Sequence, residues 1–376
     1  MRIRLLSGYL DHRAGSAVYT RRIARSLHER GHEISIIALQ HDDELAKFCD
    51  VYSCSYEPLQ LPFLWRFSHL RHFFKAKKYI ESTDFNVVDI VIASEHCFIK
   101  PYMLKYKDSP VLYFPHSVLA SEEVKRFFSD PIARFINKFL YKRAQIWALD
   151  HAKATLRYSS RLVEILRSIS KADTFILNPL GITIPTQSEA HVLNKDTVEL
   201  LFVGSLIASK KMDVCLDALS KIPNRNWHLT IVGDGPERVK YEHQVRQSSL
   251  GEHITFVGQV EDTQKHYQQA DLLLFPSVFE SFGLVMLEAM ACNVPVLSMD
   301  PSAPNMRLYG GDIVTHNKTG WLAKDGADFE RLLSAALYNP AQLNALGKAA
   351  RTHVKDHYDW DRHVDQLVAD LKRLMI

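Results

Sequence analysis

Two glutamates, Glu280 and Glu288, stand eight positions apart in the stretch FPSVFESFGLVMLEAM, residues 275–290. The first precedes a predicted helix, and the second lies about one and a half turns inside it. A favourable interaction with the helix dipole would explain one such carboxylate better than two. A carboxylate can also accept hydrogen bonds from neutral hydroxyls, stabilise positive charge, or hold a vicinal diol. We therefore interpret Glu280 as a group for hydroxyls or positive charge, and Glu288 as a group for a diol.

The residues between the two glutamates favour an anion site. Gly283 lets the backbone come close to a ligand. The N–H groups of Phe282, Gly283 and Leu284 lie at the helix start, where helical N–H groups lack partners within the helix and suit phosphate oxygens. Hydroxyls, a diol and a diphosphate are together the parts of a nucleotide sugar.

The elements that must position these groups alternate between short apolar strands and amphipathic helices. The sequence predicts strands at 3–8, 34–39, 87–94 and 110–117, a helix at 16–31, and then a second series with strands at 198–204, 227–233, 253–258, 271–277 and 294–299. This alternation is typical of a parallel sheet in each half. The polar stretch 183–196 is the predicted linker. We expect domains at 1–185 and 186–376, with the final helix, about 360–376, packing back on the first.

Each of four strands in the second half ends in a loop with glycine. The first loop carries Gly204 and Ser205 and presents Lys210 and Lys211 before a helix. The other loops are IVGDGPE (231–237), FVGQVED (256–262) and FPSVFESFG (275–283). Ligands of parallel sheets bind outside the carboxyl ends of the strands. Four such loops on one edge therefore indicate a ligand site.

The sequence resembles the retaining glycosyltransferases of family 4, which have the GT-B fold. Its most specific element is the E-x7-E motif, Glu280-SFGLVML-Glu288, followed by AMACNVPV. The contexts LLFVGSL, LTIVGDGPE, ITFVGQV and ADLLLFPS occur in the family's order. In the first half, the family's glycine-rich loop and helix resemble AGSAVYTRRIARSLHERGHEISII. Its strand that ends at a donor-facing histidine resembles PVLYFPHS, and its signature before the linker resembles NPLGI. The resemblance implies an α/β protein with two Rossmann-like domains facing across a central cleft.

The resemblance also assigns roles to residues. Glu280 approaches the transferred sugar, Glu288 holds the ribose hydroxyls, and Lys210 meets the diphosphate. His116 contacts the sugar across the cleft. The remaining residues implied are Gly15 and Ser16 in the acceptor-side loop and, on the donor side, Ser281, Phe282, Gly283, Leu284, Gly204, Ser205, Lys211, Gln259 and Val260, the last two lying by the base.

Each catalytic assignment has a simpler alternative. Glu280 is alternatively a capping residue, His116 a histidine with satisfied hydrogen bonds at a strand end, and Lys210 a solvated loop lysine. No metal site is expected. The triplet Asp-Trp-Asp at 359–361 resembles a metal-binding DxD, but it stands at a helix start, where aspartate caps the helix.

The sequence departs from the family at two places. The family usually has an arginine where Ser205 stands, so one phosphate cation is missing unless Lys211 supplies it. The segment 299–314 is longer than the family's short glycine turn, which affects the expected donor contacts there.

Charge is divided unevenly along the chain. Residues 1–185 hold 27 Lys and Arg against 19 Asp and Glu, whereas residues 186–376 hold 19 Lys and Arg against 24 Asp and Glu.

Two segments of the first half combine basic and apolar positions. The stretch 58–80 has five basic and no acidic residues, with aromatic residues at helical spacing, and 124–149 also combines basic and apolar positions. Basic amphipathic helices lie on anionic membrane surfaces. In the alternative, the aromatic faces pack on the first sheet. No nucleic-acid recognition module is visible.

The 376 residues contain no apolar run long enough to span a membrane, and the first residues are interpreted as a buried strand rather than a signal peptide. Five scattered cysteines suit a reducing compartment. We therefore expect a cytoplasmic protein, peripheral on the inner face of the plasma membrane.

The predicted function is metal-independent transfer of a hexosyl unit, without a cofactor, from a nucleoside-diphosphate sugar, with a UDP-sugar favoured. The predicted acceptor is a glycan or lipid-linked molecule of bacterial surface polysaccharide or lipopolysaccharide synthesis. A nucleotide-sugar epimerase of the same fold and a donor-binding but catalytically weak partner subunit stay as alternatives. An NAD-dependent oxidoreductase is disfavoured because GYLDHRAG lacks G-x-G-x-x-G.

Overall fold

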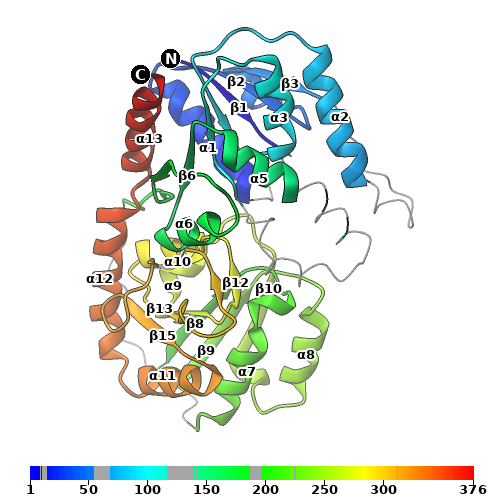
Figure 1. Ribbon diagram of the computed structural model, residues 1–376. Helices are drawn as coiled ribbons and strands as arrows, with labels where there is room; N and C mark the ends of the chain where they lie inside the picture. The colour runs from blue at the N-terminus through cyan, green and yellow to red at the C-terminus, as the bar shows by residue number, and fades with distance from the viewer. Residues whose placement is uncertain are drawn as a thin grey trace. The chain divides into compact units, whose positions relative to one another are not determined.

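The computed structural model describes residues 1–8, 10, 15–54, 68–116, 135, 139, 142–186, 197–223, 226–310 and 312–376. The chain divides into two compact units (Figure 1). The first unit comprises residues 1–178 and 363–376, and the second comprises residues 179–362.

The first unit is built on a parallel seven-stranded sheet in the order β3-β2-β1-β4-β5-β6-β7. Its strands are β1 Arg2–Leu6, β2 Glu33–Ala38, β3 Asp50–Ser53, β4 Ile90–Ala93, β5 Val111–Tyr113, β6 Ala154–Arg157 and β7 Phe175–Leu177. Its helices are α1 Gly15–Glu29, η1 Leu45–Lys47, α2 Ser68–Ser82, α3 His96–Lys105, α5 Lys142–His151 and α6 Ser160–Arg167. The residues of β4 and β5 are all buried, as expected of central strands covered on both faces.

The second unit contains a parallel six-stranded sheet in the order β10-β9-β8-β11-β13-β15, and a short pair, β12 with β14. The strands are β8 Val198–Val203, β9 Trp227–Val232, β10 Ile254–Gly258, β11 Leu272–Phe275, β12 Phe279–Glu280, β13 Val296–Met299, β14 Arg307–Leu308 and β15 Gly320–Ala323. The helices are η5 Ala208–Lys210, α7 Met212–Lys221, α8 Arg238–Arg246, η6 Gly251–His253, α9 Gln264–Gln269, α10 Leu284–Ala291, α11 Gly326–Tyr338 and α12 Ala341–His357. The last helix, α13 Trp360–Met375, is shared between the two units. The two parallel sheets confirm the predicted α/β class.

The division between the units lies at 178/179, seven residues before the position expected from the sequence. The reason is backbone pairing within the second unit. The N–H of Ile182 donates to the carbonyl of Tyr358 at 2.8 Å, and the N–H of Trp360 donates to the carbonyl of Ile182 at 2.9 Å. Helix α13 starts in the second unit, and from His363 onward it belongs to the first, where it lies beside α1 (Figure 1).

Strand order reverses at one place in each main sheet. In the first unit β1 is central, with β2 and β3 on one side and β4 on the other. In the second unit β8 holds the same position, between β9 and β11. Loops that leave neighbouring strands at such a switch point diverge and leave a crevice where ligands bind. The loops after β8 and β11 are those that carry Lys210 and Glu280.

Candidate active site

The loops after β8 and β11 bring Lys210 and Glu280 together. The Lys210 ammonium forms an ion pair with Oε2 of Glu280. The backbone N–H of Val278 donates to the carbonyl of Ser209 at 3.0 Å, which ties the two loops to each other. Nζ of Lys210 also lies 5.5 Å from the centre of the Phe275 ring. The two charged side chains are only 18% and 22% exposed, so Lys210 is not a solvated loop lysine.

Helix α10 begins directly after Glu280. Gly283 is its N-cap residue, with φ 99° and ψ 48°, a left-handed conformation that favours glycine. Oε1 of Glu280 accepts a hydrogen bond from the N–H of Ser281 at 3.3 Å, ahead of the helix, and no side chain caps the start of α10 within the described part of the chain. Phe282 is buried, and Leu284 is the first helical residue. The first turn of α10 thus presents the kind of N–H groups that bind phosphate.

The segment 299–314 packs against this helix start. Within it, β14 pairs with β12 so that Leu308 lies opposite Glu280, and the N–H of Tyr309 donates to the Glu280 carbonyl at 3.0 Å. A Cβ atom on Gly310 would lie 1.9 Å from the carbonyl oxygen of Phe282, so only glycine permits this approach. The additional length of the segment therefore fixes the backbone of Glu280.

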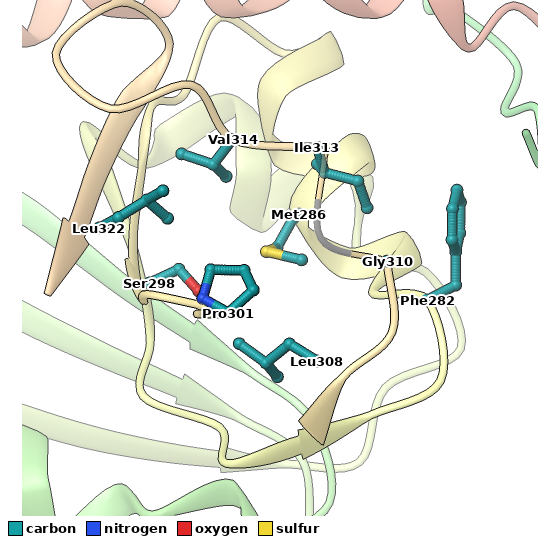
Figure 2. A pocket seen from close by; sticks show the side chains of 9 residues that line it. All are labelled: Phe282, Met286, Ser298, Pro301, Leu308, Gly310, Ile313, Val314 and Leu322. Atoms are coloured by element: carbon teal, nitrogen blue, oxygen red, sulfur yellow. The ribbon is translucent and has the colours of Figure 1, made fainter. Parts of the chain in front are cut away.

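An apolar pocket lies between α10 and the same segment. Figure 2 shows Met286 pointing into it from α10, with Ile313 and Leu322 on other sides. The hydroxyl of Ser298, which also lines it, already donates to the carbonyl of Met299 at 3.1 Å. This lining does not suit sugar hydroxyls, so the pocket is not the donor site.

Glu288 lies on α10 beside Tyr267 of α9. The Tyr267 hydroxyl donates to Oε2 of Glu288 at 2.8 Å. Burial, and then the neighbouring carboxylate, raise the pKa of Tyr267 well above its usual value, so this hydroxyl stays a donor across the physiological pH range. The bond orients the carboxylate. The sequence analysis did not identify Tyr267, because it precedes Glu288 by 21 residues and lies on another helix.

The loops after β8 and β9 approach each other through glycines. A Cβ atom on Gly233 would lie 2.0 Å from the carbonyl oxygen of Gly204. Ser205 is exposed and brings no charge. Lys211 is the N-cap residue of α7 in a left-handed conformation, with φ 53° and ψ 40°, and its ammonium lies 3.4 Å from Oδ2 of Asp213. Lys211 is therefore already engaged by a carboxylate.

Gln259 and Val260 follow β10 at the same edge of the sheet, the first exposed and the second half-buried. The carbonyl of Gly258 accepts a hydrogen bond from the N–H of Gly233 at 2.8 Å, which holds this loop to the neighbouring one.

The structure also adds a cation that was not singled out from the sequence. Arg307 in β14 lies opposite Phe279, one register position from Glu280.

In the first unit, His116 follows β5 and packs against aromatic rings. Its ring centre is 4.6 Å from that of Phe114 and 5.8 Å from that of Tyr19. Its Nε2 atom is buried and has no hydrogen-bond partner among the described residues, so within them the alternative of a fully satisfied histidine does not hold at this nitrogen. Burial lowers the pKa of His116 to about 4, although Glu95 opposes the shift. The imidazole is therefore neutral at physiological pH.

A chain of hydrogen bonds supports the neighbour of His116. The Tyr19 hydroxyl and Nε2 of His363 are 2.9 Å apart, and Nδ1 of His363 lies 2.8 Å from Oδ1 of Asn178. The Asn178 amide also donates to the His363 carbonyl at 3.2 Å. The NPLGI stretch thus begins with a residue that holds α13 to the first unit.

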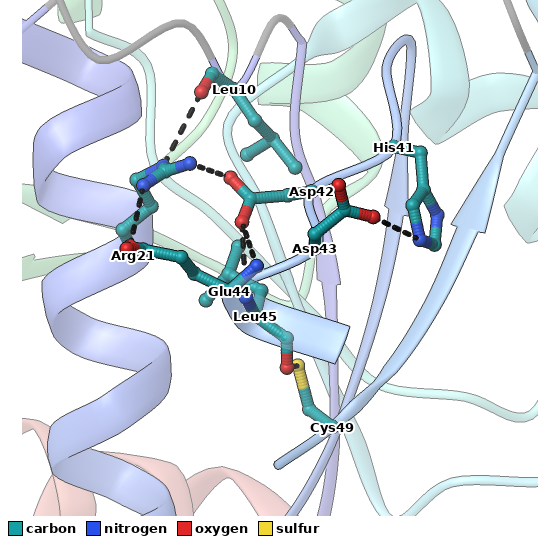
Figure 3. Close-up of polar contacts among 8 residues, drawn as sticks. All are labelled: Leu10, Arg21, His41, Asp42, Asp43, Glu44, Leu45 and Cys49. Carbon is teal, nitrogen blue, oxygen red and sulfur yellow. Dashed lines mark hydrogen bonds and ion pairs between the residues drawn. The ribbon is translucent and has the colours of Figure 1, made fainter. Parts of the chain in front are cut away.

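Gly15 and Ser16 are the first two residues of α1. Leu10, which precedes them in the chain, is held by Arg21, whose Nε donates to the Leu10 carbonyl at 3.3 Å. Figure 3 shows that Arg21 is in turn held by Asp42. Oδ1 of this buried aspartate accepts the N–H of Leu45 at 3.0 Å. Residues 11–14 lie outside the described residues.

The two segments interpreted as membrane-facing are partly described. In 58–80 the described residues belong to α2, and Phe74 is 55% exposed. In 124–149, Phe135 and Phe139 are 65% and 55% exposed, and their rings stack with centres 5.8 Å apart. The alternative in which these aromatic residues pack on the sheet is therefore wrong for all three. No helix within the described ranges is long and apolar enough to cross a membrane.

Both halves of the chain match models of glycosyltransferases. A model of group 1 glycosyl transferases matches residues 183–353, and a model of glycosyltransferase family 4 matches residues 13–177. Human alpha-1,3/1,6-mannosyltransferase ALG2 is 26% identical over 237 residues, which are 57% of this chain and 56% of that protein. The chain therefore spans about half the length of this relative.

Two solved structures resemble the whole chain. Sucrose-phosphate synthase from Thermosynechococcus elongatus has a TM-score of 0.78 and 23% identity, covering 100% of this chain and 99% of that one. Anabaena HepE in complex with UDP has a TM-score of 0.75 and 17% identity, covering 99% and 100%. These likenesses show the GT-B fold. With both halves matched by glycosyltransferase models, the chain belongs to glycosyltransferase family 4.

Proposed function

We propose that this protein transfers a hexosyl unit, with retention of anomeric configuration, from a UDP-sugar to a glycan or lipid-linked acceptor. The ion pair of Lys210 and Glu280 beside the start of α10 carries the proposal, because it combines groups for a diphosphate and for a sugar. The UDP bound by Anabaena HepE, which has the same fold, favours uridine. The basic balance of residues 1–185 supports an anionic acceptor, such as an intermediate of bacterial surface polysaccharide or lipopolysaccharide.

In this proposal no side chain acts as the base. The bond between the sugar C1 and the leaving phosphate oxygen breaks as the acceptor oxygen approaches C1 from the same face. The leaving phosphate oxygen then takes the acceptor proton. Lys210 and the N–H groups of α10 stabilise the departing diphosphate, and Glu280 stabilises positive charge on the sugar. Neutral His116 hydrogen-bonds a sugar hydroxyl without adding charge.

Donor binding should be visible as thermal stabilisation. At about 100 times its Kd, a UDP-sugar should add about 2.7 kcal/mol to the free energy of unfolding, and matched GDP- and ADP-sugars should add less. If no nucleotide sugar raises the melting temperature, the proposal fails.

Glu288→Gln should raise donor KM by roughly 10- to 100-fold with a smaller effect on kcat, because a ribose diol does not change during the reaction. Tyr267→Phe, which removes only the orienting hydroxyl, should give a smaller rise in KM.

Turnover should survive EDTA, because Lys210 and the start of α10 supply the positive charge that a divalent cation would otherwise bring to the diphosphate. The triplet at 359–361 is consistent with this, since Oδ1 of Asp359 accepts the N–H of Arg362 at 3.0 Å, as a capping residue does. The measurement is the initial rate with and without the chelator. A loss of activity that Mg²⁺ or Mn²⁺ restores would show that a metal takes part.

We also propose that the enzyme lies on anionic membranes through α2 and the exposed Phe135–Phe139 pair. Changing Lys75, Lys77 and Lys78 to Glu should release it from phosphatidylglycerol vesicles at physiological salt, because each basic residue near such a surface contributes about 1 kcal/mol. As a matched control, Lys240, Lys265 and Lys324 are changed to Glu in the second unit, with the same change in net charge. Equal co-sedimentation of both triple variants would contradict the proposal.

A further inference from the structure

A buried arginine in the first unit has guanidinium N–H groups without partners in the described part of the chain. Arg157 is the last residue of β6 and is 0% exposed. Its Nη1 donates to the carbonyl of the preceding Leu156, whereas Nε and Nη2 are buried and make no hydrogen bond to any residue that the structure describes. Within the described part of the chain, no carboxylate forms an ion pair with it. Buried cations are normally paired, because moving an isolated charge from water into a protein is strongly unfavourable.

The surroundings of Arg157 are aromatic rather than acidic. Its Cζ lies 5.1 Å from the centre of the Phe175 ring, and Cζ of Arg167 lies 5.3 Å from the same ring. On the adjacent strand, the Tyr113 hydroxyl accepts a hydrogen bond from Gln145 at 3.3 Å. Burial lowers the pKa of Arg157 to about 9, so the guanidinium remains charged at physiological pH. Two guanidinium groups lie on one ring, and no carboxylate among the described residues pairs with Arg157.

The same sheet contains an equally buried arginine whose donors are satisfied. Arg4 in β1 is 1% exposed. Its Nε donates to the hydroxyl of Ser35 at 3.0 Å, and its Nη1 donates to the hydroxyl of Tyr102 at 3.1 Å. Its Cζ also lies 5.3 Å from the centre of the Phe85 ring. Arg4 therefore has a structural explanation that Arg157 lacks.

We propose that Arg157 anchors a second anion site, in the first unit, for a phosphoryl group carried by the acceptor. A guanidinium binds two oxygens of such a group with its fork of N–H donors. Arg157 stands at the carboxyl end of its strand, where its carbonyl accepts the N–H of Asn178 at 2.7 Å, and this edge of a parallel sheet is where ligands bind. Neighbouring side chains must shift to admit the group. The acceptor assignment rests on the proposed function.

Melting temperatures distinguish this site from a structural arginine. Arg157→Met replaces an unpaired buried cation by an apolar chain of similar length, so the melting temperature without added anion should stay the same or rise. Arg4→Met, the matched control, breaks satisfied hydrogen bonds and should lower it. A fall in Arg157→Met as large as that in Arg4→Met would count against the anion site.

Phosphate binding is then titrated with UDP at saturation, so that the diphosphate site of the second unit is filled. Wild type and Arg4→Met should still be stabilised by inorganic phosphate. Arg157→Met should lose at least about tenfold in phosphate affinity, as expected for a charged hydrogen-bond pair. If the wild type shows no response to phosphate under these conditions, the site is refuted, whether or not the variants fold. Intact UDP binding in the same sample would leave the proposed function standing.

The source of the phosphoryl group is tested with vesicles. Arg157→Met and wild type should bind phosphatidylglycerol vesicles equally if the group belongs to the acceptor. In turnover assays the variant should raise the KM for a phosphorylated acceptor while leaving the KM for the UDP-sugar unchanged. If Arg157→Met instead loses vesicle binding, the group is a lipid headgroup and the acceptor assignment is overturned.

Discussion

Glu280→Gln is expected to lower kcat on the order of 10²–10³-fold while changing donor KM little, because a single electrostatic group facing a developing charge has effects of this size. Glutamine keeps the shape of the side chain and removes its charge. The substitution also leaves the Lys210 ammonium without its partner. Single-turnover and steady-state rates should be measured on protein whose melting temperature shows that it is folded.

The control for this experiment is Glu288→Gln, which carries the same chemical change on the same helix region but should mainly raise KM. Opposite patterns in the two variants would separate sugar from ribose contacts. If folded Glu280→Gln retained wild-type kcat, Glu280 would only position Lys210, and the assignment to the sugar would fail.

Lys210→Ala should lower kcat at least as much as Glu280→Gln. Ser205 offers no second cation, and the Lys211 ammonium is engaged by Asp213, so the departing diphosphate would lose its main side-chain cation. The variant also leaves the Glu280 carboxylate largely buried and unpaired, which is unfavourable. Lys210→Arg should retain part of the activity, because it preserves the charge.

The double variant Lys210→Ala/Glu280→Gln tests whether the pair works as a unit. Its loss should be clearly smaller than the product of the two single losses, because each single change already breaks the ion pair. Arg307→Ala is the companion measurement. If Lys210→Ala keeps near wild-type kcat and Arg307→Ala does not, Arg307 is the phosphate cation and Lys210 only holds Glu280.

Nine of the strands were predictable because they are continuous apolar runs, whereas β3, β6, β7, β12, β14 and β15 were not predicted. The run VELLFVG gave β8 and DLLLFPS gave β11 almost to the residue, and the start of α10 followed from the glycine after Glu280. Parallel order explains why the strand-end loops share an edge. The family resemblance then indicated which of these loops bind the donor.

The partners of the site residues could not be predicted in the same way. The Lys210–Glu280 pair joins positions 70 residues apart, and its formation depends on β8 and β11 being neighbours across a switch in strand order. The Tyr267–Glu288 bond depends on how two helices pack. Arg157 lies in β6, a strand that was not predicted, and only its three-dimensional surroundings reveal that its charge has no carboxylate partner among the described residues.

The path of α13 has a consequence for biosynthesis. Residues 179–362 are continuous in the chain, so the second unit is complete once they have left the ribosome. The first unit must wait for residues 363–376, because the bonds of His363 to Tyr19 and Asn178 cannot form before then. Domains usually fold in the order in which they are translated, with the N-terminal one first. Of these two units, the one whose residues are translated first is therefore the last to be finished.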